Sequence, residues 1–400
     1  MKKSVWISIS LILVSALLIP LEGGRSSAPQ EKWVARYNGP GNGLDRANAI
    51  AVDGSGNVYL TGWSEGSGTD YDYATIKYSA GGKQLWVKRY NGPGNGSDHA
   101  HAIAVESSGN VYVTGGSEGS DTKEDYATIK YSTNGKQLWV NTYNGPAKGN
   151  NNASAIAVDD AGNVYVTGYS KGSGTDYDYA TIKYSTNGKQ LWVNRYNGPA
   201  NGIDWAWRIA VDGSGNVYIT GDSMGSGIQD DFDYTTIKYS ASGKQLWVKR
   251  YNGTGNGFNA TRAIAVDGSG NVYVTGLSEG LGTKEDFATI KYSTNGKQLW
   301  VKRYNGPGNS YKSDYATDIA VDSSGNVYVT GKSEGSGAKV DYATIKYSTN
   351  GKQLWVKRYS GPAKGDNSAW AIAVDSSSNV YVTGGSDGSG TESDYATIKY

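Results

Sequence analysis

The chain has 400 residues and is rich in Gly (57) and Tyr (32), whereas Phe (3), Met (2) and His (2) are scarce and Cys is absent. Its formal net charge of +1 gives no sign of nucleic-acid binding, and the lack of Cys excludes disulfides and thiol chemistry. Gly supplies tight turns, while Tyr, Val, Ile, Thr and Trp suit a pleated, half-buried surface, so the composition favours an all-β fold.

The chain begins with a segment that has the layout of a secretory signal. Two lysines open it, residues 5–21 are almost wholly apolar, and the small residues 26–28 offer a cleavage site. We predict a signal peptide over residues 1–28 and a mature domain over residues 29–400 that is periplasmic, cell-surface or extracellular. An uncleaved anchor is the alternative, because the apolar run approaches the minimum length of a membrane span. We expect no membrane span after signal removal.

Three sequence markers recur seven times each, at spacings of 53 or 55 residues. The first is a Trp, at Trp33, Trp86, Trp139, Trp192, Trp247, Trp300 and Trp355. The second is the Asn of an Asn-Val-Tyr triplet, at Asn57, Asn110, Asn163, Asn216, Asn271, Asn326 and Asn379. The third is an Asp before a run ending in Thr-Ile-Lys-Tyr, at Asp72, Asp125, Asp178, Asp233, Asp286, Asp341 and Asp394. A fixed period of this length indicates a repeat architecture.

Each repeat contains four strand-like runs separated by Gly, Asn, Asp or Ser. In the first repeat they cover residues 49–53, 57–62, 73–78 and 84–90, which we call strands A to D. A four-stranded antiparallel unit at this period predicts a propeller blade, so the seven repeats predict a seven-bladed β-propeller. The links between strands A and B and between strands C and D are interpreted as hairpin turns in which Gly takes a positive φ.

The ends of the repeat array predict how the ring closes. Residues 33–37 form a strand D before any strand A, and the sequence stops at Tyr400, the last residue of the seventh strand C. We expect the N-terminal outer strand to pair with residues 395–400 and complete the last blade. This pairing would also cover a sheet edge that could otherwise aggregate.

The repeat itself has a recognisable relative. The segments Ala263–Gly276 and Asp318–Gly331 resemble the SBBP repeat, the bacterial seven-bladed β-propeller repeat family. This resemblance covers nearly all of residues 33–400 and implies an exported or surface-associated propeller, mostly without an assigned activity and without catalytic residues to carry over. The run at residues 294–300 also resembles the Trp-docking repeat of quinoprotein-type propellers, in its Trp scaffold alone.

Differences between the repeats mark one face as a candidate binding surface. Two-residue insertions lie in the B–C loop of the fourth repeat (222–232) and in the D–A link before the sixth (305–315), and in a propeller these links share a face. The fourth residue before the strand A Ile is Arg46, His99, Asn152, Trp205, Ala260, Tyr315 or Ser368. The second is Asn48, His101, Ser154, Trp207, Arg262, Thr317 or Trp370. Both columns should face the mouth of the central channel, because residues i and i+2 of an extended segment share a side.

The candidate ligand-binding residues come mainly from these two columns. Trp205, Trp207 and Trp370 are extra to the seven repeated Trp residues and offer flat apolar faces to sugars or peptide side chains. The other candidates are Tyr315, Arg46, Arg262, His99, His101 and Trp63. Packing at the channel mouth is the alternative interpretation of the Trp residues.

Two patterns in the sequence could bind a metal ion, and each has a simpler explanation. His99 and His101, beside Asp98, could present ligands to a metal, but the repeats supply no second cluster, so an exposed polar pair is preferred. The A–B turns, such as residues 53–57, resemble calcium loops but carry fewer carboxylates. An Asp that binds turn amides explains every copy of this turn. We therefore expect no metal and no cofactor.

The carboxylates give no catalytic pair. The strand C Asp occurs once in every repeat and is interpreted as structural. Acidic residues of the B–C loops could supply a general acid and base if two converged, but their spacing fixes no pair, and a solvated face is preferred. The leading hypothesis is a non-catalytic binding or scaffold module for a glycan or a protein. The alternatives are a secreted polysaccharide lyase or hydrolase that uses carboxylates or the His pair on the same face, and a structural surface-layer component.

Overall fold

The computed structural model describes residues 32–120, 123–225, 231–255, 257–308, 313–335, 339–363, 365–388 and 393–400. The signal peptide expected over residues 1–28 lies outside these ranges. Within them every regular element is a β-strand, 27 in all, and there is no helix that could cross a membrane.

The strands follow the four-part repeat of the sequence. The first strands of the units are β1 (Asp45–Val52), β5 (Asp98–Val105), β9 (Asn151–Val158), β13 (Asp204–Val211), β17 (Asn259–Val266), β21 (Tyr315–Val321) and β25 (Asn367–Val374). The second strands are β2 (Val58–Glu65), β6 (Val111–Glu118), β10 (Val164–Lys171), β14 (Val217–Met224), β18 (Val272–Glu279), β22 (Val327–Glu334) and β26 (Val380–Asp387). The third strands are β3 (Tyr71–Tyr78), β7 (Glu124–Tyr131), β11 (Tyr177–Tyr184), β15 (Phe232–Tyr239), β19 (Glu285–Tyr292), β23 (Val340–Tyr347) and β27 (Ser393–Lys399). The fourth strands are β4 (Gln84–Tyr90), β8 (Gln137–Tyr143), β12 (Gln190–Tyr196), β16 (Gln245–Tyr251), β20 (Gln298–Tyr304) and β24 (Gln353–Tyr359).

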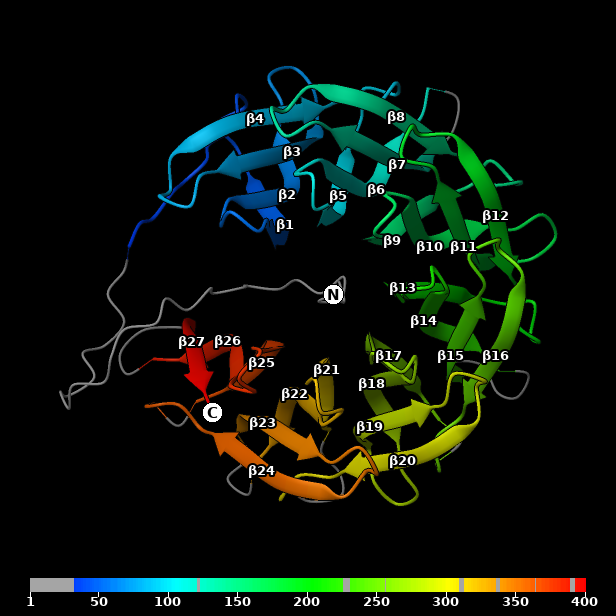
Figure 1. Cartoon of the computed structure of the whole chain (residues 1–400), viewed down its shortest axis with the longest axis vertical. Coiled ribbons are helices and arrows are strands. Elements are labelled where there is room, and N and C mark those ends of the chain that lie inside the picture. The colour runs from blue at the N-terminus through cyan, green and yellow to red at the C-terminus, as the bar shows by residue number, and fades with distance from the viewer. Residues whose placement is uncertain are drawn as a thin grey trace.

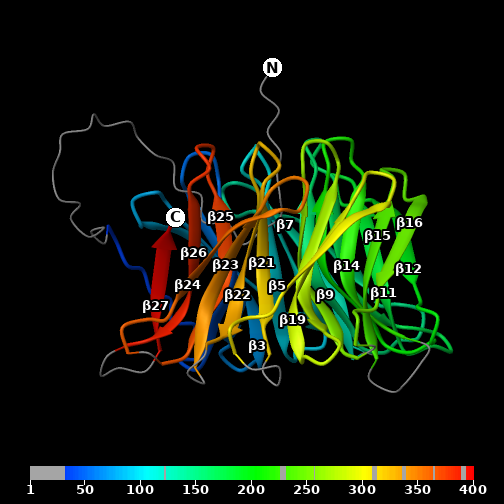
Figure 2. The same cartoon turned by 90° about the horizontal axis from the view of Figure 1, so that it is seen from below.

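Consecutive strands pair antiparallel and form six four-stranded sheets and one three-stranded sheet, β25–β27. We number the sheets one to seven in chain order. Figure 1 shows them arranged radially around an open centre, with the first strands innermost and the fourth strands outermost. In Figure 2 the strands run between the two faces of a disc. The fold is therefore an all-β propeller built from repeated four-stranded antiparallel sheets.

The two faces of the disc carry different connections. At one face the A–B and C–D turns meet, and the Thr133 hydroxyl donates to the Ser108 carbonyl oxygen at 3.1 Å. At the other face the D–A links meet the B–C loops, and the Gly94 N–H donates to the Glu118 carbonyl oxygen at 3.0 Å. We call these the turn face and the loop face. The grouping of the variable links on one face is thereby confirmed.

The first strand of each sheet is longer than the sequence predicted. In the first sheet it begins at Asp45 rather than at Ala49. A β-bulge between Ala47 and Ala49 leaves Asn48 without a partner on β2 and interrupts the alternation by which a strand is recognised. Both variable columns therefore lie inside the first strands, one at the bulge and the other two residues before it.

The hydrophobic core lies between neighbouring sheets. Tyr59 and Tyr73 of the first sheet are fully buried against Val111 and Val113 of the second, and equivalent clusters occupy the later junctions. The inner strands are thus covered on both faces, which explains why they read as nearly continuous runs of Val, Tyr, Ile and Ala.

A repeated set of contacts, which we call the clasp, joins each of the first five sheets to the next. At the first junction, Lys77 Nζ and Trp86 Nε1 both donate to the Thr133 carbonyl oxygen, at 3.2 and 3.1 Å. The ammonium also lies 4.9 Å from the centre of the Tyr59 ring. The indole covers Gly135, which has a φ of +77° and no space for a Cβ. The equivalent acceptors at later junctions are the carbonyl oxygens of Thr186, Ala241, Thr294 and Thr349.

A second repeated cluster surrounds the strand D arginine. Arg303 donates to Asp286 Oδ2 at 2.9 Å, to the Ser278 hydroxyl at 2.7 Å and, across the junction, to the Tyr251 hydroxyl at 3.3 Å. The same set of partners surrounds Arg89, Arg195, Arg250 and Arg358. The strand C Asp is therefore a structural residue, as its recurrence predicted.

The N-terminal segment contacts the first sheet in the way that the outer strand of a preceding sheet would. Trp33 Nε1 donates to the Ala80 carbonyl oxygen at 3.1 Å, and its ring lies 6.0 Å from that of Tyr78. The Tyr37 hydroxyl accepts a hydrogen bond from Arg89 at 3.3 Å. Residues 33–37 do not pair with β27, however, and the seventh sheet keeps three strands. The expected pairing that closes the ring is therefore not formed in the structure.

Candidate functional site

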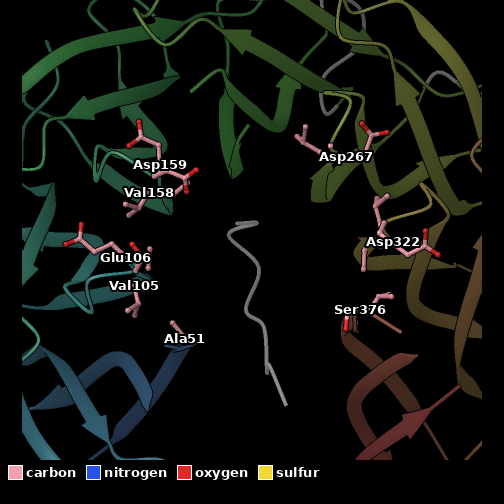
Figure 3. A pocket seen from close by; sticks show the side chains of 18 of the residues that line it. Ala51, Val105, Glu106, Val158, Asp159, Asp267, Asp322 and Ser376 are labelled. Carbon is pink, nitrogen blue, oxygen red and sulfur yellow. The ribbon is translucent and has the colours of Figure 1, made fainter. Parts of the chain in front are cut away.

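The centre of the radial arrangement of sheets is hollow at the turn face. A cavity of about 1050 Å³ is lined there by Val and Ala side chains of the first strands and by A–B turns, mostly of sheets two, three, five and six. Figure 3 shows Glu106, Asp159, Asp267 and Asp322 around this opening. The cavity lies at the opposite end of the channel from the predicted ligand surface.

The carboxylates around this opening accept hydrogen bonds from groups in or next to their own turns. Asp322 Oδ1 accepts hydrogen bonds from the N–H groups of Ser324 and Asn326, at 2.9 and 2.8 Å. Its Oδ2 accepts from the Asn326 amide and the Tyr328 hydroxyl, both at 2.9 Å. Burial alone would raise the pKa of Asp322, but these hydrogen bonds outweigh it and hold the pKa below its ordinary value. This bonding supports the turn interpretation over the calcium one.

At the loop face, the predicted residues of sheets one and two form a packed group. The Trp63 ring lies 4.6 Å from Tyr71 and 5.7 Å from His99, whose ring lies 6.5 Å from His101. The strand register places Arg46 opposite Trp63. Burial, assisted by the charges of His99 and Arg46, lowers the pKa of His101 to about 4, so this imidazole is neutral at pH 7. Both histidines are partly buried, which corrects the expectation of an exposed pair.

No metal site accompanies these histidines in the part of the chain that the structure describes. Nowhere in those ranges do three or more His, Asp or Glu side chains gather in a way that could hold an ion.

Sheets three to five carry a larger aromatic group at the loop face, which we call the aromatic cluster. Its members are Tyr169, Tyr177, Trp205, Trp207, Phe232 and Phe258. Trp205 is central, because its ring centre lies 5.8 Å from that of Phe232 in a stacked geometry and 5.9 Å from that of Trp207. Both indoles stay partly exposed, and Phe258 is 38% exposed. The structure thus brings two of the three predicted Trp residues together.

A buried carboxylate fixes the orientation of one indole. Asp222, on β14, is 4% exposed and accepts a hydrogen bond from Trp207 Nε1 at 2.7 Å. Its other oxygen accepts the Thr261 N–H at 2.7 Å, and the Arg262 guanidinium lies 3.7 Å away. Burial raises the pKa of Asp222 to about 6, although Arg262 and the hydrogen bonds oppose the shift. Asp222 therefore joins sheets four and five directly beneath the aromatic cluster.

Two further charged residues lie next to this group, at the position just before the strand A Ile. Arg208 and Asp318 stand where five repeats have Ala. Water reaches the Arg208 side chain, yet the surrounding sheets desolvate the guanidinium and lower its pKa, an effect opposed by Asp318 and strengthened by Arg262. Burial likewise raises the pKa of Asp318 to about 6. The channel mouth therefore carries both signs of charge on sheets four to six.

The remaining predicted residues lie apart from the aromatic cluster. Tyr315, on sheet six, lies under the ammonium group of Lys332, 4.4 Å from the ring centre. Trp370, on sheet seven, is 54% exposed, and its ring meets that of Tyr395 edge to face at 6.3 Å. The structure does not bring Trp370 into contact with Trp205 or Trp207 within the described residues.

Three residues at this site were missed by the sequence reasoning. Asp222 occupies the strand B position that holds Trp, Gly, Tyr, Leu or Lys in the other repeats. Arg208 and Asp318 replace an otherwise repeated Ala. Comparing every column of the repeats, rather than two columns of the D–A link, would have found all three.

Comparison with known proteins agrees with the fold at the level of the repeat. The profile of the SBBP β-propeller repeat matches residues 32–68, 149–174, 192–228 and 299–337. An uncharacterized WD repeat-containing protein, L264 of Acanthamoeba polyphaga mimivirus, is 25% identical in an alignment of 448 residues that covers 90% of this chain. The chain spans about a third of the length of that relative, with 31% of it covered.

Two solved structures are similar to the chain at low identity. The β-propeller domain of the trilobed protease from Pyrococcus furiosus covers 88% of this chain and 97% of its own, with 9% identity and a TM-score of 0.47. A luciferin-regenerating enzyme covers 71% and 83%, with 13% identity and a TM-score of 0.37. The SBBP β-propeller repeat profile thus matches four regions of a chain whose repeated four-stranded antiparallel sheets are those of a β-propeller.

Proposed function

We propose that the chain is an exported, non-catalytic binding module whose ligand docks on the loop face, at the aromatic cluster. The observation that carries this proposal is the cluster itself, which breaks the repeat in sheets three to five. A side chain that serves the scaffold is needed in every sheet. Side chains found only in sheets three to five are therefore available for recognition of a ligand. Trp and Tyr are the residues that most often dominate binding energy. Partly exposed indoles favour a glycan, whose sugar rings stack on them.

A screen of glycans and proteins with residues 29–400 tests this proposal. We expect glycan binding, with a loss of about tenfold or more in affinity when Trp205 and Trp207 are both replaced by Ala. Leu281→Ala is the control, because this loop-face side chain is 85% exposed and lies outside the cluster. Circular dichroism would check that each variant is folded. Unchanged affinity of the Trp variant would refute the site, and cleavage of a bound glycan would replace the binding proposal with an enzymatic one.

We also propose that the ring closes as a seven-bladed propeller, with residues 33–37 as the outer strand of the seventh sheet. The support is that Trp33 already makes the contacts of an outer-strand Trp with the following sheet. In a closed ring, Lys399 would add the second donor to the Ala80 carbonyl oxygen, as Lys77 does at the first junction. Arg36 would likewise occupy the position that Arg89 holds beside the strand C Asp.

Cysteine pairs offer a direct test of closure, because the chain has no Cys of its own. By the register of the first sheet, in which Thr75 pairs with Lys88, Ala35 should face Thr397. An Ala35→Cys, Thr397→Cys variant should therefore form an intramolecular disulfide on oxidation. The control pair, Ala35→Cys with Lys399→Cys, is two residues out of register, about 7–8 Å apart, and should not. A disulfide between two chains, or none in the first pair, would refute closure within one chain.

The export part of the proposal depends on the signal-like residues 1–28. Expression of the whole chain in a bacterial host, followed by mass measurement of the protein in the periplasm or medium, should give a product that begins near residue 29. A cytoplasmic product of full length would refute export.

A further inference from the structure

The polar groups at the channel mouth differ in their remaining hydrogen-bonding capacity. Asp222 uses one oxygen for Trp207 and the other for the Thr261 N–H. Asp318 uses its two oxygens for the N–H groups of Ile319 and of Ile372 in the next sheet, both at 2.9 Å. Each oxygen of both carboxylates therefore already accepts a hydrogen bond inside the protein.

The two arginines beside them are in the opposite situation. Arg208 and Arg262 each donate one hydrogen bond, at 3.0 Å, to the carbonyl oxygen of the preceding residue. A guanidinium carries five N–H donors, so most of the donors of both groups remain for a ligand. The Arg208 side chain is exposed and that of Arg262 is 39% exposed. The channel mouth thus offers donors, and an anion is the ligand that would use them.

We infer that the ligand of this site is an acidic glycan, whose uronate carboxylates bind Arg208 and Arg262 while its sugar rings stack on Trp205 and Trp207. The inference rests on the proposed binding function and adds the chemical class of the ligand. Guanidinium groups match a carboxylate bidentately, which gives a planar and oriented contact. The neighbouring indoles supply the apolar faces that the uronate rings would need.

Comparison of the repeats suggests a variant for the test that should not disturb the fold. Ala stands at the position of Arg208 in five repeats, so Arg208→Ala restores the common residue and should leave the fold intact. Lys123→Ala is the matched control, because this cation is exposed on the same face, in the B–C loop of the second sheet, and is not a member of the aromatic cluster. Both variants and the unaltered protein would be titrated calorimetrically with oligogalacturonate and with a neutral galactan oligosaccharide of equal length.

We expect the unaltered protein to bind the oligogalacturonate, with an affinity that falls as salt is added. Arg208→Ala should weaken this binding by about tenfold or more, as expected for a charge-assisted hydrogen bond, whereas Lys123→Ala should change it less than twofold. Equal binding of the neutral oligosaccharide, with no effect of Arg208→Ala, would overturn the acidic-glycan inference and leave the proposed binding function standing. Binding of neither oligosaccharide would overturn the inference, and a screen that finds a protein ligand alone would do the same.

Discussion

The exposure of a single tyrosine provides a quantitative test of ring closure. In the structure Tyr395 on β27 is 88% exposed, whereas Tyr73, Tyr126 and Tyr342, at the same position in other sheets, are fully buried. An aromatic side chain buries about 150–250 Å², so closure would remove roughly 130–220 Å² of Tyr395 from water. At about 25 cal/mol per Å² this contributes about 3–5 kcal/mol. Its hydroxyl would also find the Ala74 carbonyl oxygen, as Tyr73 finds that of Ala127 at 3.3 Å.

Tyr395→Ala should therefore lower the free energy of unfolding by about 3–5 kcal/mol if the ring closes, and by less than about 0.5 kcal/mol if it does not. Urea denaturation followed by Trp fluorescence measures the difference. Tyr342→Ala is the positive control, because this ring is buried in the structure as it stands. Tyr395→Phe should cost about 1 kcal/mol, since Phe287 already fills the equivalent position in sheet five. Closure would be refuted if Tyr395→Ala left the free energy of unfolding unchanged while Tyr342→Ala lowered it.

Three further predictions concern stability and are measured by the same denaturation assay. Arg303→Ala should cost about 3 kcal/mol, because Asp286 would keep a largely buried charge without its partner; a cost below about 0.5 kcal/mol would contradict this role. Gly296→Ala should cost about 2 kcal/mol or more, because φ is +76° and an indole covers the residue, whereas Gly81→Ala, in open space, should be nearly neutral. Burial raises the pKa of Asp204 to about 6, so its ionised form weakens the fold as pH rises from about 4 to 6. Asn stands at the position of Asp204 in three other sheets. Asp204→Asn should therefore raise the free energy of unfolding by up to about 3 kcal/mol at pH 7.5 and by little at pH 4. Equal effects at both pH values would exclude the charge of Asp204 as the cause.

Most of the fold follows from the period of the sequence, because each strand repeats with the same spacing and alternation. The predicted strand D of the first repeat, residues 84–90, coincides with β4. The first strand was predicted too short, since the bulge at Asn48 puts one residue out of alternation. A bulge of this kind leaves no signal in hydrophobic periodicity, so its position needs the pairing of the two strands.

The candidate site was only partly accessible from the sequence. Trp205 and Trp207 stood out because small or polar residues fill their columns in most repeats. The role of Asp222 could not be inferred in the same way, because it depends on Trp207 from its own sheet and Thr261 from the next meeting at one carboxylate. Trp370 satisfied the same sequence criterion as the other two Trp residues, yet it lies on the seventh sheet, apart from the cluster. Contacts between sheets decide the roles of these residues, and a comparison of equivalent positions in the repeats does not show such contacts.

The clasp between neighbouring sheets has a mechanical consequence. Lys77 and Trp86 donate hydrogen bonds to a turn of the second sheet, and the third to sixth sheets are each bound in the same way by the sheet before. Both ends of the repeat array belong to a single boundary of the disc, between the first and last sheets (Figure 1). Tension applied to the two ends would therefore load that boundary first and then peel the sheets away one at a time. Each step would release 53 or 55 residues, so a stretched molecule should lengthen in nearly equal increments.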